Sequence, residues 1–344
     1  MNAHAPVTAP QVRIADPTEP ALEAFVRAHP QATPFHLPQW SRAIEAGTGQ
    51  RAHLLVAEQE GAIRAFLPLS EIRSPLFGSL LASAGFGVDG GILSSDSGSA
   101  RLLAEAAVKL AERLDCPAIE LRGGTPPAGW RVSEGTYVSF ARDLPSDDEA
   151  ILKAIPRKQR AEVRRASGFG LDVTIGRDAA VHHRVYAQSV RNLGTPVFPR
   201  RLFEAVLDAF GEDTDILTVS KDGKPLASVL SLYFNGTVHP YWGGGSHEAR
   251  AARANELMYY ALMRHAAARG CTRFDFGRSK AGTGAFAFKK NWGFAPRPLR
   301  YAQYGETRDA NPLSPRYRLQ VALWRRLPLW LANRLGPPIA RGLG

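Results

Sequence analysis

Hydrophobic positions along the chain follow two periods, and these periods predict a mixture of helices and strands. In residues 255–269 the apolar side chains recur three or four positions apart, which is typical of a helix with one buried face. Residues 56–70 and 219–233 each contain two apolar runs around an acid-glycine pair, which predicts a hairpin. The chain therefore combines hairpins with long helices.

The second half of the chain shows these periods most clearly. The predicted elements are a strand 171–175, helices 179–192 and 200–210, strands 215–220, 225–234 and 237–242, helix 255–269, strand 272–277, helix 284–291 and strand 299–304. Hairpin-linked strands followed by a crossover helix predict a mixed, partly antiparallel α/β sheet. No GxGxxG motif follows an opening strand, which argues against nicotinamide chemistry.

Part of the sequence is repeated. Residues 109–124 and 264–279 both contain an Ala-rich helix, a tight turn and a short strand that carries an acid. Glycines precede both helices, and a hairpin lies upstream of each. Three matches in the same order favour an internal duplication. We therefore predict that residues 51–124 and 213–279 have the same strand order.

The excess of positive over negative charge lies in two short segments. The chain has 43 basic and 32 acidic residues, a formal net charge of +11. Residues 153–165 hold six basic residues and one acid, and residues 314–341 hold six arginines and no acid. The remainder has 31 residues of each sign. Because the bulk is neutral, the composition argues against a general nucleic-acid binder and against DNA as a partner.

Composition excludes several other classes of protein. A hydrophobic content of 44% excludes wholesale disorder. No window of about 18 apolar residues predicts a transmembrane helix, and residues 1–10 predict a disordered tail rather than a signal peptide. Two cysteines are too few for a disulfide framework, and no pattern indicates a metal site. We therefore expect a cytoplasmic protein.

Several motifs resemble a known family. They are FHLPQW (35–40), PRKQRAEVRRASGFGLDV (156–173), RNLGTPVFP (191–199), FDFGRSKAGTGAFAFKKNWGF (274–294) and LWRRLPLWLANRLGP (323–337). The chain resembles the FemAB/FemX family, and more closely the FemAB-like, BioF2-type acyltransferases associated with exosortase/PEP-CTERM exopolysaccharide systems. The resemblance covers most of the chain from Phe35 onward, and residues 274–294 are its most specific part.

The resemblance implies a fold class and a domain plan. The fold is expected to be mixed α/β, with two tandem GNAT-like acyltransferase domains that arose by internal duplication. The plan consists of a tail 1–10, a first GNAT-like domain 11–145, a second GNAT-like domain 146–305 that opens with the basic helical segment 150–166, and a basic amphipathic tail 306–344.

The resemblance also implies an activity. The FemAB/FemX family transfers an amino acid from aminoacyl-tRNA to an amine on a peptidoglycan precursor. We therefore expect an N-acyltransferase that acts on an amine of a cell-envelope or exopolysaccharide precursor. No bound cofactor is required, and the acyl donor is either aminoacyl-tRNA or acyl-CoA. The alternative is a catalytically silent, membrane-associated scaffold for polysaccharide assembly.

Two residues are candidates for the chemistry. Acyl transfer to an amine needs positive charge where the oxyanion develops. In FemX-like enzymes a Phe-Lys pair stands at the reaction centre, and the resemblance carries these roles to Phe288 and Lys289; on residue pattern alone they would be a helix end with exposed lysines. Asp275 lies at the end of a strand, where it either orients the amine or accepts its proton through water, or instead forms an ion pair with Arg273 or Arg278.

Other residues are candidates for substrate binding. They are Arg278, Arg191, Thr195, Tyr241, Trp242 and Trp40. A guanidinium suits a phosphate or carboxylate, and aromatic side chains suit the wall of a site. The alternatives are a structural helix-helix turn around Arg191 and Thr195, and burial of the aromatic residues in the core.

The sequence leaves the donor open. Acetyl-CoA enzymes of the GNAT type bind pyrophosphate with a glycine-containing loop at a helix N-terminus. The matching residues 250–255 read RAARAN, without either glycine. The basic residues Arg157, Lys158, Arg160 and Arg164 suit phosphates of a donor or the backbone of tRNA.

The basic tail has two interpretations. Residues 314–341 combine arginines with Trp324, Trp330 and several leucines, a composition typical of an interfacial segment. Pro328 divides the segment into two short helices. The tail either contacts the inner face of the cytoplasmic membrane or packs on the domains with its arginines outside.

Overall fold

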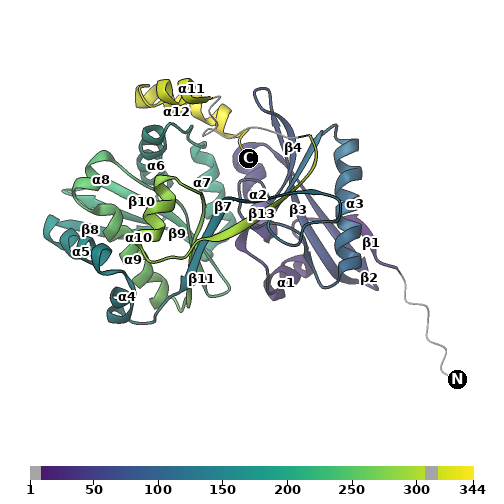
Figure 1. The fold of residues 1–344 in the computed structure, drawn as a ribbon, viewed down its shortest axis with the longest axis horizontal. Coiled ribbons are helices and arrows are strands. Elements are labelled where there is room, and N and C mark those ends of the chain that lie inside the picture. Colours follow the sequence, from purple (N-terminus) through teal and green to yellow (C-terminus); the bar gives the residue numbers. More distant parts are fainter. Residues whose placement is uncertain (1–8, 307–316) are drawn as a thin grey trace. The chain divides into compact units, whose positions relative to one another are not determined.

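The structure is a computed structural model that describes residues 9–306 and 317–344. These residues form two compact units, coloured in sequence order in Figure 1. Among them, unit 1 holds residues 9–134, 300–306 and 342–344, and unit 2 holds residues 135–299 and 317–341. The division between the units therefore falls inside two strands.

Unit 1 is a sheet with helices. Its strands are β1 (Gln11–Ile14), β2 (Arg51–Gln59), β3 (Ala62–Ser74), β4 (Gly78–Ser83), β6 (Ala118–Arg122) and the end of β13 (Arg297–Gly305), in that order, with β5 (Leu93–Ser94) beside β3. Its helices are α1 (Pro20–Ala28), α2 (Pro38–Thr48) and α3 (Ser97–Arg113). Neighbouring strands are antiparallel except for β4 and β6, which α3 connects as a parallel crossover.

Unit 2 repeats this arrangement. Its strands, in spatial order, are β8 (Leu171–Gly176), β9 (Thr214–Lys221), β10 (Lys224–Phe234), β11 (Thr237–Gly245), β12 (Arg273–Lys280) and most of β7 (Arg131–Asp143). Its helices are α4 (Asp148–Ala154), α5 (Arg157–Ala166), α6 (Ala179–Leu193), α7 (Arg200–Phe210), α8 (His247–Ala251), α9 (Ala254–Ala268), α10 (Gly284–Asn291), α11 (Arg318–Trp324) and α12 (Leu329–Ala340). Here β11 and β12 are the parallel pair.

The two units share one strand order. Strands β1 to β4 and β6 of unit 1 correspond to β8 to β12 of unit 2, and each parallel pair spans a crossover helix. The sixth strand is antiparallel in both units, β13 beside β6 and β7 beside β12. This confirms the mixed α/β fold of tandem GNAT-like domains and the predicted duplication.

The hydrophobic pattern determines where each core lies. In unit 1, α3 turns an apolar stripe that includes Leu103, Ala107 and Leu110 toward the sheet. In unit 2, α9 buries Met258, Leu262 and other residues of the same stripe. Within the described residues, no helix is both long enough and apolar enough to pass through a bilayer.

Trp40 belongs to the core of unit 1. Its side chain is fully buried, its Nε1 donates a hydrogen bond to the carbonyl of Gly85 at 3.0 Å, and its ring meets that of Phe35 edge-on. A substrate would not reach it, so the proposed acceptor contact for Trp40 is corrected to a packing role. We expect Trp40→Ala to lower the free energy of unfolding by about 3–5 kcal/mol, because it opens a cavity and orphans the Gly85 carbonyl.

Urea unfolding of Trp40→Ala measures this loss. Leu76→Ala is the matched control, because Leu76 is 67% exposed in the same unit and its removal is expected to change little. Equal stability of the two variants would contradict the packing role of Trp40.

Candidate active site

The parallel pairing in unit 2 is short. Strands β11 and β12 pair only at Thr237 with Arg273 and at Val238 with Phe274. Both strands then continue, β11 to Gly245 and β12 to Lys280, without further pairing to each other. Backbone groups beyond this point are therefore not used by the β11–β12 ladder.

A bulge in β12 shapes this place. The register between β12 and β7 shifts between Asp275 and Arg278. Gly277, inside the bulge, has φ +64°, a left-handed conformation that suits glycine. The carboxylate of Asp275 accepts a hydrogen bond from the Gly277 N–H at 2.7 Å. The bulge therefore fixes the carboxylate and directs two successive carbonyls away from β7.

The ammonium of Lys289 lies against these carbonyls. Its Nζ donates to the carbonyl oxygens of Gly277 at 3.2 Å and Arg278 at 2.8 Å. The rings of Phe140 and Phe276 lie 5.6 and 5.9 Å from Nζ. Burial lowers the pKa of Lys289 to about 7, while Asp275 acts in the opposite direction. Since an ammonium has three N–H donors, one remains for a substrate oxygen.

Local sequence explains why Lys289 points inward. Thr283 caps the N-terminus of α10 by accepting from the Phe286 N–H, and Phe286 packs edge-on against Phe140. At the other end Trp292 is fully buried. These anchors turn Lys289 toward the bulge, whereas Lys290, about 100° further around the helix, is exposed.

His239 is a group that the sequence analysis did not select. It follows Val238 at the end of the parallel pairing, is 7% exposed, and its Nδ1 lies 3.8 Å from a carboxylate oxygen of Asp275. Burial lowers its pKa, Asp275 raises it and Arg273 lowers it further. A lone histidine in a strand gives no sequence signal, because only the register of β11 and β12 places it beside Asp275.

Aromatic side chains line the same part of unit 2. Phe288 contacts Tyr259, with ring centroids 5.6 Å apart, and burial raises the pKa of Tyr259 to about 12. A Cβ atom at Gly243 would lie 2.9 Å from the Tyr259 hydroxyl, so β11 can approach this hydroxyl only with glycine there. The guanidinium of Arg278 lies over the ring of Tyr137, 5.0 Å from its centroid.

The other predicted substrate contacts lie elsewhere in unit 2. Trp242 is buried against Phe203 and Phe198, with ring centroids 5.0 and 6.0 Å away, so its predicted contact is corrected to a core role. Tyr241 beside it is half-buried. The structure does not bring Arg191 and Thr195 to Lys289. Arg191 donates to the Arg325 carbonyl, and the Thr195 N–H donates to Val190.

The basic helix α5 faces solvent. Arg157, Lys158 and Arg164 are exposed, while Arg160 is half-buried. The inward side of α5 carries Glu162, which forms an ion pair with Arg253. Arg253 has φ +59° and immediately precedes α9.

The N-terminus of α9 differs from a pyrophosphate site. Its first turn contains the half-buried Glu256, whose pKa is raised by burial and by the nearby Glu162 and lowered by its own backbone N–H and by Arg253. A carboxyl group at this helix end competes with any phosphate for the backbone N–H groups.

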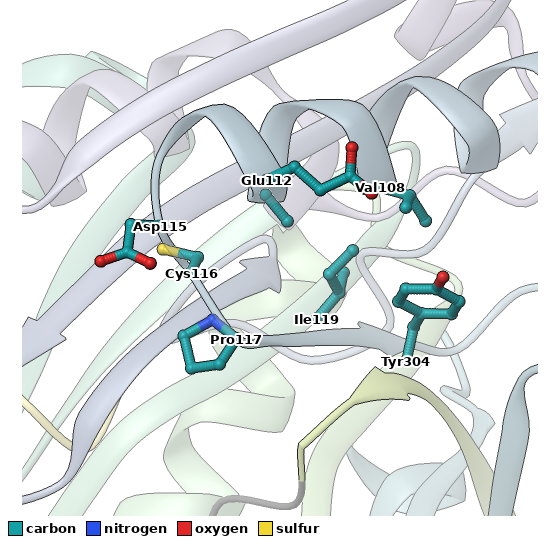
Figure 2. Close-up of a pocket in the computed structure, with 8 residues that line it drawn as sticks. Val108, Glu112, Asp115, Cys116, Pro117, Ile119 and Tyr304 are labelled. Atoms are coloured by element: carbon teal, nitrogen blue, oxygen red, sulfur yellow. The ribbon is translucent and has the colours of Figure 1, made fainter.

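A pocket lies in unit 1 at the end of α3. Figure 2 shows Cys116, Glu112 and Tyr304 among its walls. Its volume is about 230 Å³. The equivalent residue of the repeat in unit 2, Cys271, is buried in the core cluster of that unit.

Comparisons with known proteins show which of them share the fold that carries this site. Residues 153–290 match the profile of the Acetyltransferase (GNAT) domain. This range contains β11, β12, the bulge and Lys289. This part of the chain is therefore similar to a GNAT domain. No curated protein sequence matches the chain.

Solved structures are similar to this chain over most of its length, beyond the residues that match the GNAT domain. FemX is 17% identical with a TM-score of 0.66, covering 84% of this chain and 96% of FemX. A tandem GNAT protein from the clavulanic acid biosynthesis pathway is 13% identical with a TM-score of 0.57, covering 86% and 98%. The C-terminal domain of a putative lysylphosphatidylglycerol synthetase from Agrobacterium fabrum is 15% identical with a TM-score of 0.54, covering 85% and 93%. The FemX-like, tandem-GNAT fold is thus confirmed.

Proposed function

We propose that the protein is an N-acyltransferase whose reaction centre is the β12 bulge in the second GNAT-like domain, 146–305. The amine nitrogen of an acceptor attacks the carbonyl carbon of an acyl ester or thioester, and the C–N bond forms. The carbonyl oxygen gains negative charge, then the C–O or C–S bond to the donor breaks. The amine loses one proton, and the donor leaves as an alcohol or thiol.

One observation carries this proposal, the position of the Lys289 ammonium. Two of its N–H groups are held by the Gly277 and Arg278 carbonyls, which orients the third. The rings of Phe140 and Phe276 give the ammonium apolar surroundings, which strengthen its interaction with a charge on a substrate oxygen. Such a preoriented donor stabilises the oxyanion without reorganising during the reaction.

The bulge also provides a route for the proton of the amine. Asp275, held by the Gly277 N–H, is placed to orient an ammonium or amine. Burial lowers the pKa of His239, which favours the neutral imidazole that can take part in proton transfer. We assign His239 and Asp275 jointly to this step, and Phe288 and Arg278 to contacts with the substrate.

We propose aminoacyl-tRNA rather than acyl-CoA as the donor. Glu256 occupies the helix end where a GNAT enzyme would bind pyrophosphate, and the exposed face of α5 presents Arg157, Lys158 and Arg164. Arg160 completes the basic set of that helix from a half-buried position. The similarity to FemX supports this choice.

The donor proposal predicts a specific salt effect. Changing Arg157, Lys158 and Arg164 together to Gln is expected to weaken tRNA binding and to reduce the slope of log K against log salt by about 2, because each phosphate contact contributes about 0.7–0.9. Lys109→Gln with Arg113→Gln, both exposed in unit 1, is the matched control. Fluorescence titration with aminoacyl-tRNA at several salt concentrations measures the slope; an unchanged slope would remove α5 from the donor site.

A ligand panel tests the donor class directly. Thermal stabilisation by aminoacyl-tRNA, acetyl-CoA, longer acyl-CoAs and nucleotide-sugars is compared at matched concentrations. Stabilisation by aminoacyl-tRNA alone among the donors supports the proposal, and stabilisation by an acyl-CoA overturns it.

We further propose that the acceptor is an amine on a cell-envelope or exopolysaccharide precursor, as in an exosortase-associated pathway. The FemX-like fold and the acid-free basic segment 314–341 support this choice. The protein would then work in the cytoplasm, at the inner face of the cytoplasmic membrane.

A further inference from the structure

The end of the described chain forms two short helices that lie near α6 (Figure 1). Helix α12 buries Ala332, Gly336 and Ala340, which recur four residues apart on one face. A Cβ atom at Gly336 would lie 3.0 Å from the Val197 backbone nitrogen, so the fit is tight. The small residues, together with Leu329, which packs against the cluster of Ala187, Val190 and Val197, therefore attach α12 to unit 2.

Backbone-directed contacts hold α11 in the same region. Val321 lies where a Cβ atom on Gly194 would be, and Gly194 itself has φ +84°. The Arg325 guanidinium donates to the Leu193 carbonyl at 3.2 Å, and Arg191 donates to the Arg325 carbonyl at 3.1 Å. The loop after α6 is therefore the part of unit 2 on which α11 packs.

Four large apolar side chains of these helices are exposed to solvent. The exposed fractions of Leu319, Leu323 and Trp330 are 78%, 65% and 68%, and that of Leu335 is 44%. Leu319 and Leu323 lie one turn apart on α11, while Trp330 and Leu335 lie outside the face of α12 that carries its buried small residues. Neither helix needs these side chains in order to pack on unit 2.

Charge distinguishes this surface from an ordinary exposed one. Residues 317–344 contain no Asp or Glu, and their arginines are Arg318, Arg325, Arg326, Arg334 and Arg341. Arg318 and Arg334 are exposed on the same helices as the leucines and Trp330. Leucine, tryptophan and arginine together, without acids, match a bilayer interface, where apolar side chains enter the acyl boundary and arginines meet anionic headgroups.

We propose that α11 and α12 form a membrane-docking surface that binds anionic phospholipid bilayers through Leu319, Leu323, Trp330 and the arginines around them. Their packing on unit 2 makes the surface preformed, so binding does not have to order it. A second copy of this chain fits less well, because a symmetric contact would place arginines against arginines. This inference is independent of the proposed acyl transfer and would stand if that proposal failed.

Co-sedimentation with vesicles tests the surface in the full chain. The vesicles contain phosphatidylglycerol and phosphatidylcholine in equal parts, or phosphatidylcholine alone. One variant changes Leu319, Leu323 and Trp330 to Ser, a second changes Arg318, Arg326 and Arg334 to Gln, and a control changes the exposed Leu76 and Val132 of unit 1 to Ser. Circular dichroism checks that each variant is folded.

The proposal predicts a distinct result for each protein. The parent and the control variant bind the anionic vesicles and bind phosphatidylcholine weakly. The arginine variant is expected to bind anionic vesicles on the order of a hundredfold more weakly, since each arginine contributes about fivefold, and the apolar variant is expected to lose binding to a similar extent. Parent-like binding by both variants overturns the proposal, as does a change in oligomeric state without vesicle binding.

Discussion

Replacing Lys289 by Met is expected to reduce the rate of acyl transfer by about 10²–10³-fold. The ammonium is the positive group held against the β12 bulge, and removing one preoriented donor to an oxyanion typically costs about 2.7–4 kcal/mol of transition-state stabilisation. Methionine keeps the apolar stem of the side chain against Phe140 and Phe276. The turnover of labelled acyl groups into amide measures the effect.

The neighbouring lysine provides the control. Lys290→Met changes the same residue type on the same helix, but its side chain is exposed, so near-normal turnover is expected. Lys289→Ala is a poorer variant than Lys289→Met, because both remove the ammonium from the two carbonyls but only Ala also removes the stem from beside Phe140 and Phe276. If Lys289→Met turns over like Lys290→Met, then Lys289 has only a structural role.

The pH dependence of transfer should change sharply near neutrality. The pKa of Lys289 is lowered to about 7 by burial, and the proposed role requires the protonated form. The ratio of kcat/KM for the parent to that for Lys289→Met is therefore expected to be constant below pH 7 and to fall about tenfold per pH unit above it. Taking this ratio cancels the ionisation of the acceptor amine, which both proteins share.

Stability provides a second measure of the same pKa. The unfolded chain holds the Lys289 proton up to a pKa of about 10.4, whereas the folded chain releases it near 7, so this group makes stability rise with pH between these values. The melting temperature of the parent should rise relative to Lys289→Met across that window. Parallel curves for the two proteins, together with a flat kcat/KM ratio, would contradict the lowered pKa.

Local sequence signals predicted the elements of unit 2 closely. Helices α7 and α10 have the residues expected, 200–210 and 284–291, because Pro199, Gly211 and the Thr283 cap limit them. Hairpin β9–β10 was visible from the acid-glycine turn at residues 222–223. The duplication then supplied the strand order of unit 1, since each half repeats the same local pattern.

Long-range pairing was not visible in the sequence. The expected strand 299–304 was placed with the second copy, yet β13 pairs with β6 of unit 1, and β7 pairs with β12 of unit 2. Most residues of β7 are exposed or half-buried, so its hydrophobic alternation is weak. The contact between His239 and Asp275 depends on the same kind of pairing. Gly277 lies inside a predicted strand, and a glycine at such a position is a local sequence signal for a β-bulge.

The most direct test of the central claim measures the formation of an amide from a labelled aminoacyl-tRNA and a primary-amine acceptor. Mass spectrometry detects the amide, and the proteins compared are the parent, Lys289→Met and Lys290→Met. The proposed acyl transfer predicts amide with the parent and with Lys290→Met, and at least a hundredfold less with Lys289→Met. Amide formation at equal rates in all three proteins, or in none of them, would contradict the claim that Lys289 at the β12 bulge is the centre of an acyltransferase.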